Sequence, residues 1–261
     1  MPTRPQIYAT GLLATALCLL GTDLVHALDA IDTDGPDYVE SSEVVPQDHT
    51  QYEVDLTSVR DRRAASTGNS FSTPGLLKYG IARDLELRFA PSGYMSEHGQ
   101  SGLGDSALGV KWHSQDRDPA RGLPAVSWIA HVDIPSGAKA FEGVALRPSL
   151  RSVLTWDLPH EFALGLMPGI KSDTDAQGHR YTSAIFGAVL NRHLNDQWRA
   201  FIEASAPQIA HASDGGILAS WDIGTAYLVN NDLQLGARGG VAANRNTPSS
   251  FVLFEIAQRF Q

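Results

Sequence analysis

Charged residues recur at every second position along several apolar stretches of this chain. In the run Leu85-Glu86-Leu87-Arg88-Phe89 the charges alternate with large apolar residues. An extended strand points successive side chains to opposite faces, so both charges lie on one face and the apolar residues on the other. Rows of carboxylates and cations facing a shared lumen discriminate between ions by charge. The spacing therefore predicts a polar wall.

The same alternation assigns many charged side chains to an inward face. The basic members are Lys78, Arg88, Lys111, Arg147, Arg151, Arg199, Arg238 and Arg259, and the acidic members are Glu53, Asp55, Glu86, Asp105, Asp133, Asp157, Glu203, Asp222 and Glu255. Those that we predict to line a pore are Arg88, Lys111, Asp133, Arg147, Arg151, Glu203 and Arg238. Arg147 and Arg151 share a face and would form a basic rung suited to a carboxylate or phenolate. Two interpretations stay open: a wall that selects solutes, or a network of ion pairs that fills a narrow barrel.

No catalytic or metal-binding set stands out from the sequence. His131 and Asp133 share a face and could form an ion pair, although ordinary wall residues would look the same. Ser183 and Ser220 are available as nucleophiles, but no histidine is tied to either by local spacing, which leaves a membrane-rim hydrolase as a third hypothesis. The histidines lack metal-ligand spacing, so we expect no metal site, no cofactor and no enzyme.

A repeated chain reversal positions the alternating segments. An aliphatic residue, a few turn formers and a new alternating run occur around Ile81, Leu158, Leu194 and Val229, the last three about 36 residues apart. Such spacing fits two strands and one longer loop per repeat. The predicted strands are residues 49–59, 70–80, 84–93, 104–114, 123–135, 144–157, 161–172, 181–192, 197–206, 217–228, 232–243 and 251–260. We predict an all-β fold, an antiparallel up-and-down transmembrane β-barrel of about 12 strands.

Segment length and loop pattern point to a membrane. Strands of roughly 9 to 13 residues suit a tilted bilayer crossing. Most connections after even-numbered strands are short, apart from residues 115–121, whereas residues 62–69, 94–101 and 173–180 read as longer loops. The expected girdle of outward aromatics beside the short turns comprises Tyr79, Trp112, Trp156, Phe162, Trp198 and Tyr227. The alternative is a water-soluble β-sandwich that uses these aromatics as core.

The N-terminus has the pattern of an export signal. An apolar stretch from Ile7 to Leu20 follows Arg4 and leads to Val25-His26-Ala27, which favours cleavage after Ala27 or Ala30 over a retained anchor. Cys18, the only cysteine, lies inside this stretch, so the mature chain has no disulfide. The predicted organisation is residues 1–27 as signal peptide, 28–48 as an acidic N-terminal segment and 49–261 as the barrel.

The acidic N-terminal segment carries seven acidic residues and no basic one. The simplest interpretation is a solvated tail; the alternative is a segment that enters the barrel end and meets basic lumen residues. The net charge of the chain is −9, which argues against nucleic acid as a partner.

Several blocks in order resemble a bacterial outer-membrane transporter family linked to the meta-cleavage pathway of phenol degradation. They are Asp32-Thr33-Asp34-Gly35-Pro36-Asp37, Leu77-Lys78-Tyr79-Gly80-Ile81, Gly102-Leu103-Gly104-Asp105 and Ile134-Pro135-Ser136-Gly137. The resemblance covers residues 32–260. Two departures stand out: Gly35 replaces a basic residue that is usual in the family, and Gln261 follows the terminal aromatic Phe260, which barrel assembly machinery reads.

The resemblance implies a barrel in the bacterial cell outer membrane, in contact with outer-membrane lipid and with the barrel assembly machinery. It further implies a channel or transporter for small solutes, aromatic or hydrophobic ones among them. The alternative from another class is a closed structural or adhesive barrel that acts through its long external loops.

Overall fold

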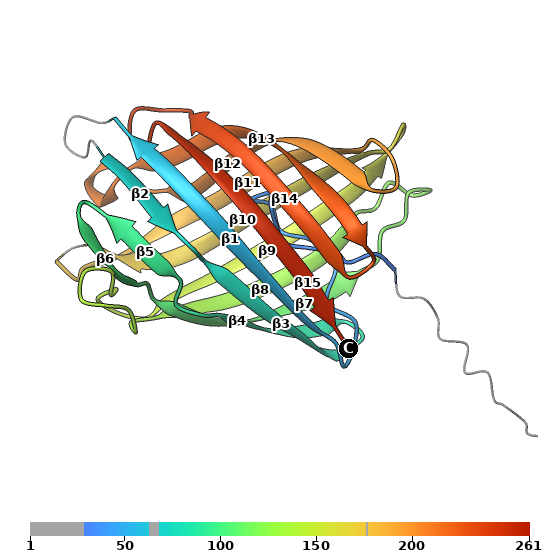
Figure 1. Cartoon of the computed structure of the whole chain (residues 1–261), viewed down its shortest axis with the longest axis horizontal. Coiled ribbons are helices and arrows are strands. Elements are labelled where there is room, and N and C mark those ends of the chain that lie inside the picture. Colours follow the sequence, from blue (N-terminus) through green and yellow to red (C-terminus); the bar gives the residue numbers. More distant parts are fainter. Residues whose placement is uncertain (1–28, 63–67, 176) are drawn as a thin grey trace, which may run out of the picture.

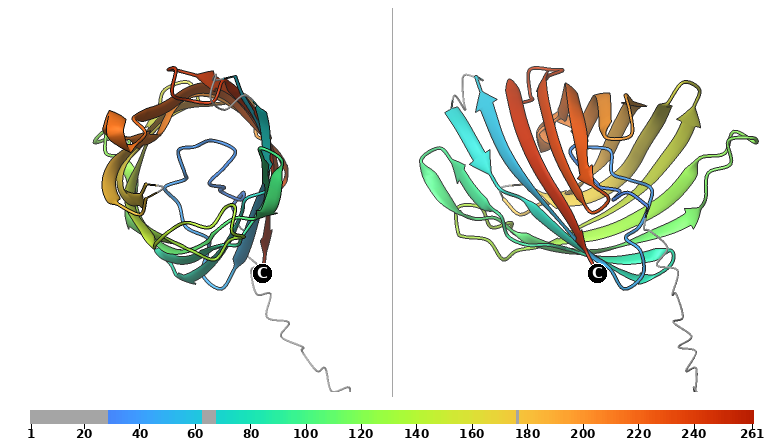
Figure 2. Two further views of the ribbon diagram at one scale, coloured as in Figure 1. Left: turned by 90° about the vertical axis from the view of Figure 1, so that its left-hand side faces the viewer. Right: turned by 45° about the vertical axis from the view of Figure 1, so that its right-hand side comes forward.

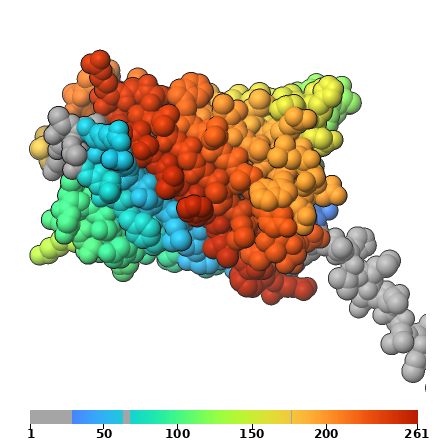
Figure 3. Space-filling view, turned by 45° about the horizontal axis from the view of Figure 1, so that its top comes forward, coloured from blue at the N-terminus to red at the C-terminus, as the bar shows by residue number. Residues whose placement is uncertain are grey.

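A computed structural model describes residues 29–62, 68–175 and 177–261. The chain forms one sheet whose first strand, β1, pairs with its last, β15, so the sheet closes on itself as a barrel (Figures 1 and 2). Every strand pairing within these residues is antiparallel, and the space-filling view shows a continuous outer wall over β1, β14 and β15 (Figure 3). The predicted signal peptide, residues 1–27, lies outside the described residues.

The strand segments are short near the start of the barrel and long after it. Their bounds are β1 (Thr50–Asp61), β2 (Gly68–Ser72), β3 (Gly75–Ala82), β4 (Leu85–Ala90), β5 (Tyr94–Glu97), β6 (Gln100–Leu103), β7 (Ser106–Gln115), β8 (Ala125–Ile134), β9 (Arg147–Leu158), β10 (Phe162–Thr174), β11 (Arg180–His193), β12 (Trp198–Ile209), β13 (Ile217–Asn230), β14 (Leu233–Ala242) and β15 (Ser250–Phe260), with one 3-10 turn, η1 (Ala212–Asp214).

Three of the barrel strands are interrupted. β2 and β3 both pair with β1 and are separated by Thr73 and Pro74, while Pro91 to Gly93 separate β4 from β5. Proline lacks the N–H that a ladder needs, which explains both breaks. A third break, at Gly104 and Asp105, separates β6 from β7. Counting each interrupted pair as one leaves twelve barrel strands, so the predicted fold class is confirmed.

One predicted loop is wrong. Residues 94–101 are predicted as one of the longer loops, yet β5 and β6 pair with each other from Tyr94–Leu103 to Glu97–Gln100. A two-residue turn at His98 and Gly99 closes this hairpin, and both residues have positive φ, 50° and 77°. Tight hairpins need that left-handed backbone. Backbone hydrogen bonding between β5 and β6 therefore outweighs the weak strand propensity of their side chains.

The two faces of the wall differ sharply in chemistry. In β15 the outward Val252, Phe254 and Ile256 are exposed, whereas the inward Leu253, Glu255 and Ala257 are buried. Of the predicted girdle, Tyr79, Trp112 and Trp198 are exposed and the other three are half-buried. An apolar outer belt around a closed barrel is the surface that lipid tails solvate, and an apolar exterior rules out the soluble-sandwich alternative.

No helix in the described part of the chain is long and apolar enough to cross a membrane.

The barrel has a turn end and a loop end. At the turn end lie residues 83–84, 116–124, 159–161, 194–197 and 231–232, together with the start of β1 and the C-terminus. At the loop end lie longer connections such as residues 135–146, 210–216 and 243–249. Apart from residues 116–124, the connections at the turn end are short, and short turns at one end with longer loops at the other are typical of outer-membrane barrels.

The outer belt makes a test of the register possible. Ile223 is 65% exposed in the middle of β13. We expect Ile223→Arg to lower the free energy of unfolding from a bilayer by about 2–4 kcal/mol, because an arginine at mid-depth faces hydrocarbon. Urea unfolding in liposomes measures it, with Ile223→Leu as the control. A cost no larger than that of the leucine variant would place Ile223 off the lipid face.

Candidate functional site: the lumen and the N-terminal segment

The acidic N-terminal segment lies inside the barrel. It starts at the turn end, where the Ile31 amide donates to the Asn231 carbonyl, and it returns there at Gln47, which bridges to Gly80. Between these points residues 32–45 form a loop within the lumen (Figure 2, blue). The interpretation of this segment as a solvated tail is therefore wrong, because its carboxylates find better partners on the barrel wall than in water.

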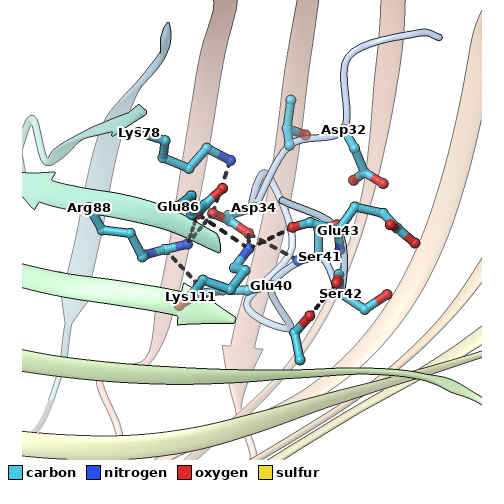
Figure 4. Close-up of polar contacts among 12 residues, drawn as sticks. Asp32, Asp34, Glu40, Ser41, Ser42, Glu43, Lys78, Glu86, Arg88 and Lys111 are labelled. Carbon is cyan, nitrogen blue, oxygen red and sulfur yellow. Dashed lines mark hydrogen bonds and ion pairs between the residues drawn. The ribbon is translucent and has the colours of Figure 1, made fainter. Parts of the chain in front are cut away.

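Asp34 is the centre of these contacts (Figure 4). One carboxylate oxygen lies 2.6 Å from Lys111 Nζ, and the other lies 3.0 Å from Lys78 Nζ and 2.9 Å from an Arg88 nitrogen. These three cations come from β3, β4 and β7 and are almost fully buried. A buried cation without a partner is strongly unfavourable, so a single carboxylate serves three strands at once.

The electrostatics of Asp34 follow from this geometry. Burial by itself raises the pKa of a carboxyl group, because it disfavours the charged form. At Asp34 the opposing influence of Arg88, Lys111 and Lys78 is larger and holds the pKa well below its ordinary value. Asp34 is therefore a carboxylate at any pH the protein meets near neutrality.

Four further ion pairs, made by three acidic residues, hold the same segment. Arg199 on β12 binds Asp37 through two nitrogens, at 2.6 and 2.8 Å. Glu40 pairs with Arg88 at 2.7 Å and with Arg151. Near the turn end Arg117 lies 2.6 Å from Glu43. Arginine–carboxylate contacts with two bonds fix orientation as well as position, so the loop has one defined path.

Acidic wall residues bind the backbone of the segment. Glu203 accepts hydrogen bonds from the amides of Tyr38 and Val39, at 2.8 and 2.7 Å, and Glu86 accepts one from Val45 at 2.8 Å. Backbone amides buried without an acceptor are costly. The wall therefore supplies cations to the side chains of the segment and anions to its backbone.

The opposite side of the barrel wall packs against the segment through apolar side chains. Val39 packs in a buried cluster with Ile129, Val153, Met167, Val189 and Phe201. A β-carbon added at Gly187 would lie 2.7 Å from a methyl of Val39, so glycine is what lets the segment approach β11. Burying a valine side chain contributes about 1.5–3 kcal/mol. This contact also explains β11, which is apolar on both faces: one faces outward and the other faces Val39.

The structure places all seven predicted pore-lining residues on the inner side of the wall. Arg88, Lys111, Arg151 and Glu203 contact the N-terminal segment directly. Arg238 reaches it through Glu203, 2.8 Å away. That solute passes along these side chains stays a prediction.

Arg147 and Asp133 belong to a separate cluster. Arg147 lies 2.9 Å from Asp105 and 3.4 Å from Asp133. Asp105 in turn accepts hydrogen bonds from backbone amides at Ser136 and Gly137, which anchors the loop between β8 and β9. The rung expected from Arg147 and Arg151 is thus split, because each arginine has its own carboxylate partners.

Two cavities adjoin the segment. One of about 620 Å³ opens toward the turn end beside Asp157, His160 and Glu161. The other, of about 250 Å³, lies farther toward the loop end beside Asp55 and Gly75. Asp37 and Glu40 line both cavities. The N-terminal segment therefore lies between two compartments of the lumen.

A serine, a histidine and an aspartate do come together near the turn end. The Ser127 hydroxyl lies 3.3 Å from His113 Nδ1, and His113 Nε2 lies 2.9 Å from Asp116. The hydroxyl is fully buried, however, and donates to the carbonyl of Ser42. It cannot meet a substrate there. Its contact with Ser42 makes it one more anchor of the segment.

The sequence hypotheses about other polar groups can now be placed. His131 and Asp133 form no ion pair with each other among the described residues, and the ring of His131 lies over Gly109 instead. Ser220 pairs with the hydroxyl of Ser205 at 2.9 Å, and Ser183 is buried. In the described ranges no group of three or more His, Cys, Asp or Glu is arranged to hold a metal ion.

Comparison by sequence gives the family. The pattern of the family described as "Putative MetA-pathway of phenol degradation" matches residues 33–260. The chain belongs to this family. The matched range includes most of the acidic segment as well as the barrel. By sequence, the chain has no significant match among curated proteins.

Comparison by structure gives the same architecture. An outer-membrane channel from Pseudomonas putida F1 aligns with a TM-score of 0.66 at 15% identity, covering 84% of this chain and 98% of that one. The NanC porin aligns with a TM-score of 0.50 at 12% identity, covering 80% and 99%. The KdgM porin, solved with disordered oligogalacturonate, aligns with 0.50 at 7%, covering 82% and 98%. At these identities the likeness concerns the fold.

Sequence reasoning missed the individual partners of the segment. Asp34, Asp37 and Glu40 stood out only as members of an acidic stretch. A signal was present, since a buried face bearing Lys78, Arg88 and Lys111 needs counter-charges that their own strands do not fully supply. Which acid meets which base depends on the path of an irregular loop, and no periodicity encodes that path.

The contacts of Asp34 predict how the segment is held. Asp34→Asn leaves three buried cations short of a counter-charge, and removing one partner of a buried ion pair costs about 3–5 kcal/mol. We expect the segment to loosen. A spin label at Ser41→Cys reports it, because the only native cysteine lies in the predicted signal. Asp34→Asn should sharpen the spectrum, whereas Asp48→Asn, an exposed carboxylate on the same segment, should not. Identical spectra for both variants would contradict this role of Asp34.

Proposed function

We propose that the protein is a diffusion channel of the bacterial outer membrane in which the N-terminal segment forms the constriction. The observation that carries the proposal is the position of residues 32–45 between two lumen cavities that both touch Asp37 and Glu40. A lumen that is hollow on both sides of a single loop suits passage regulated by that loop. The apolar outer belt and the family membership support the location.

The solutes proposed are small, with aromatic acids among them. The family description supplies the link to phenol degradation. Support from the chain itself comes from basic side chains along the lumen, such as Arg147 and Arg151, which can attract a carboxylate or phenolate. Both arginines are engaged by carboxylates, so the attraction would act through exchange of partners rather than through free cations.

Solute flux tests the proposal. Purified mature protein in liposomes is compared for benzoate, phenol and a neutral pentose. Faster uptake of benzoate than of the sugar supports a channel that prefers anions, and equal uptake of all three solutes supports a general pore. No uptake through a barrel whose folding is verified by heat-dependent migration would reject the channel. It would favour the second hypothesis, a closed barrel that acts through its external loops.

The Asp37–Arg199 pair offers a matched test of the constriction. Arg199→Asp places two carboxylates together, and like charges repel at contact distance. We expect a higher single-channel conductance in planar bilayers, because the loop is pushed off the wall. The reversed pair, Asp37→Arg with Arg199→Asp, should return the conductance toward the wild-type value. If both proteins conduct like wild type, the segment does not limit the flow.

A further inference from the structure

The smaller of the two lumen cavities, of about 250 Å³, has one wall whose carboxylates have no cationic partner in the described part of the chain. Toward β4 and β9 the cavity is lined by Arg88 and Arg151, and Asp34 and Glu40 of the segment neutralise both. Toward β1 and β15 it is lined by Asp55 and Glu255. No cation lies opposite these last two side chains within salt-bridge distance among the described residues. The imbalance is therefore local to one side of the cavity.

Glu255 is the more unusual of the two carboxylates. It is 5% exposed, and neither of its oxygens has a hydrogen-bond partner among the described residues. A buried carboxylate without partners is costly. Asp55 is its direct neighbour across the β1–β15 ladder, so the two side chains leave the wall side by side. Like charges directly opposite each other destabilise a sheet, which makes the pair a place where positive charge is favourable.

The neighbouring arginines cannot serve this pair, because they are engaged elsewhere. Arg199 is held by Asp37 through two bonds, and Arg238 lies 2.8 Å from Glu203. Lys78 is shared between Asp34 and Glu53. Each of these cations would leave a buried carboxylate behind if it moved. No side chain in the described part of the chain therefore supplies the positive charge that would balance Asp55 and Glu255.

Gly35 shows where that charge would enter. A β-carbon added at Gly35 would lie 2.6 Å from one carboxylate oxygen of Glu255, so the segment passes this carboxylate with no side chain between them. Glu255 thus sits at the boundary between the wall and the loop that narrows the lumen. No cluster of three or more metal-ligand side chains surrounds it in the part of the chain that the structure describes. The geometry suits a singly charged group rather than a multivalent metal.

We propose that Asp55 and Glu255 form a cation-binding subsite in the lumen, on the loop side of the constriction. It takes a monovalent cationic group, either an inorganic ion or the ammonium of a small organic solute. The subsite rests on the proposed channel function and adds a second selectivity to it: cationic groups are attracted by the β1–β15 side of the cavity, whereas an anionic group reaches the arginines of the other side only by exchange with their carboxylate partners. A solute that carries both charges would fit both sides.

Ion selectivity is the first test. Reversal potentials are measured in planar bilayers under gradients of potassium chloride and, separately, of ethylammonium chloride. In Asp55→Asn/Glu255→Gln we expect the cation-to-chloride permeability ratio to fall about fivefold, the factor for one unit charge about 4 Å away in water. A fall with both salts or with either one supports the subsite, and the salt that responds identifies the source of the cation. Asp214→Asn, which removes one carboxylate from a loop-end turn, is the control.

A second measurement does not depend on conduction. Gly35→Lys would place a tethered ammonium beside Glu255, and Gly35→Gln gives similar crowding without the charge. We expect the lysine variant to unfold about 2–4 °C above the glutamine variant in the heat-migration assay. If the wild-type protein conducts and the double variant has the same cation-to-chloride permeability ratio, the subsite is overturned and the channel function still stands. A protein that does not conduct rejects the channel, and equal melting of the two Gly35 variants then rejects the subsite as well.

Discussion

The contact of Asp34 with Lys78, Arg88 and Lys111 is the constraint on which the interior depends. Three buried cations on β3, β4 and β7 would repel one another across a narrow wall. One carboxylate from another part of the chain bridges all three, and Glu86 and Glu53 supply the further negative charge from the wall. The barrel and its N-terminal segment are therefore electrostatically incomplete without each other. This dependence makes the segment a part of the fold rather than an appendage.

The N-terminal segment contacts two chemically different sides of the barrel wall. Its acids face the basic side, while Val39 and Tyr38 face the apolar side of β11 and its neighbours. Glu203 joins the two halves, since it binds the backbone at Tyr38 and Val39 and also Arg238. A loop without regular structure gains a single path only if side chains, backbone and apolar contacts all agree. Here they agree over residues 32–45, which is why a short irregular stretch can lie between two cavities without filling either.

The barrel was predictable because its signal is periodic. Alternation in runs such as Leu85 to Phe89 indicated which side chains face inward, and the seven residues predicted to line a pore lie on the inner side of the wall. Deviations came where periodicity is weak: the hairpin of β5 and β6 has loop-like composition, and β11 is apolar on both faces for a tertiary reason. The position of the N-terminal segment could not be read, since an acidic stretch without alternation fits both water and a basic lumen. The choice is made by cations that are distant in sequence.

Whether a charged side chain in the lumen is paired decides how much it contributes to ion selectivity. Counting charges along the wall suggests a strongly basic rung at Arg147 and Arg151, yet Asp105, Asp133 and Glu40 neutralise both arginines. A charge that is already paired contributes little field at a distance, because the fields of the two partners nearly cancel. Around the smaller cavity, the carboxyl groups that have no salt-bridge partner among the described residues are those of Asp55 and Glu255. Near that cavity, the field that a solute meets therefore depends more on these two side chains than on the paired majority.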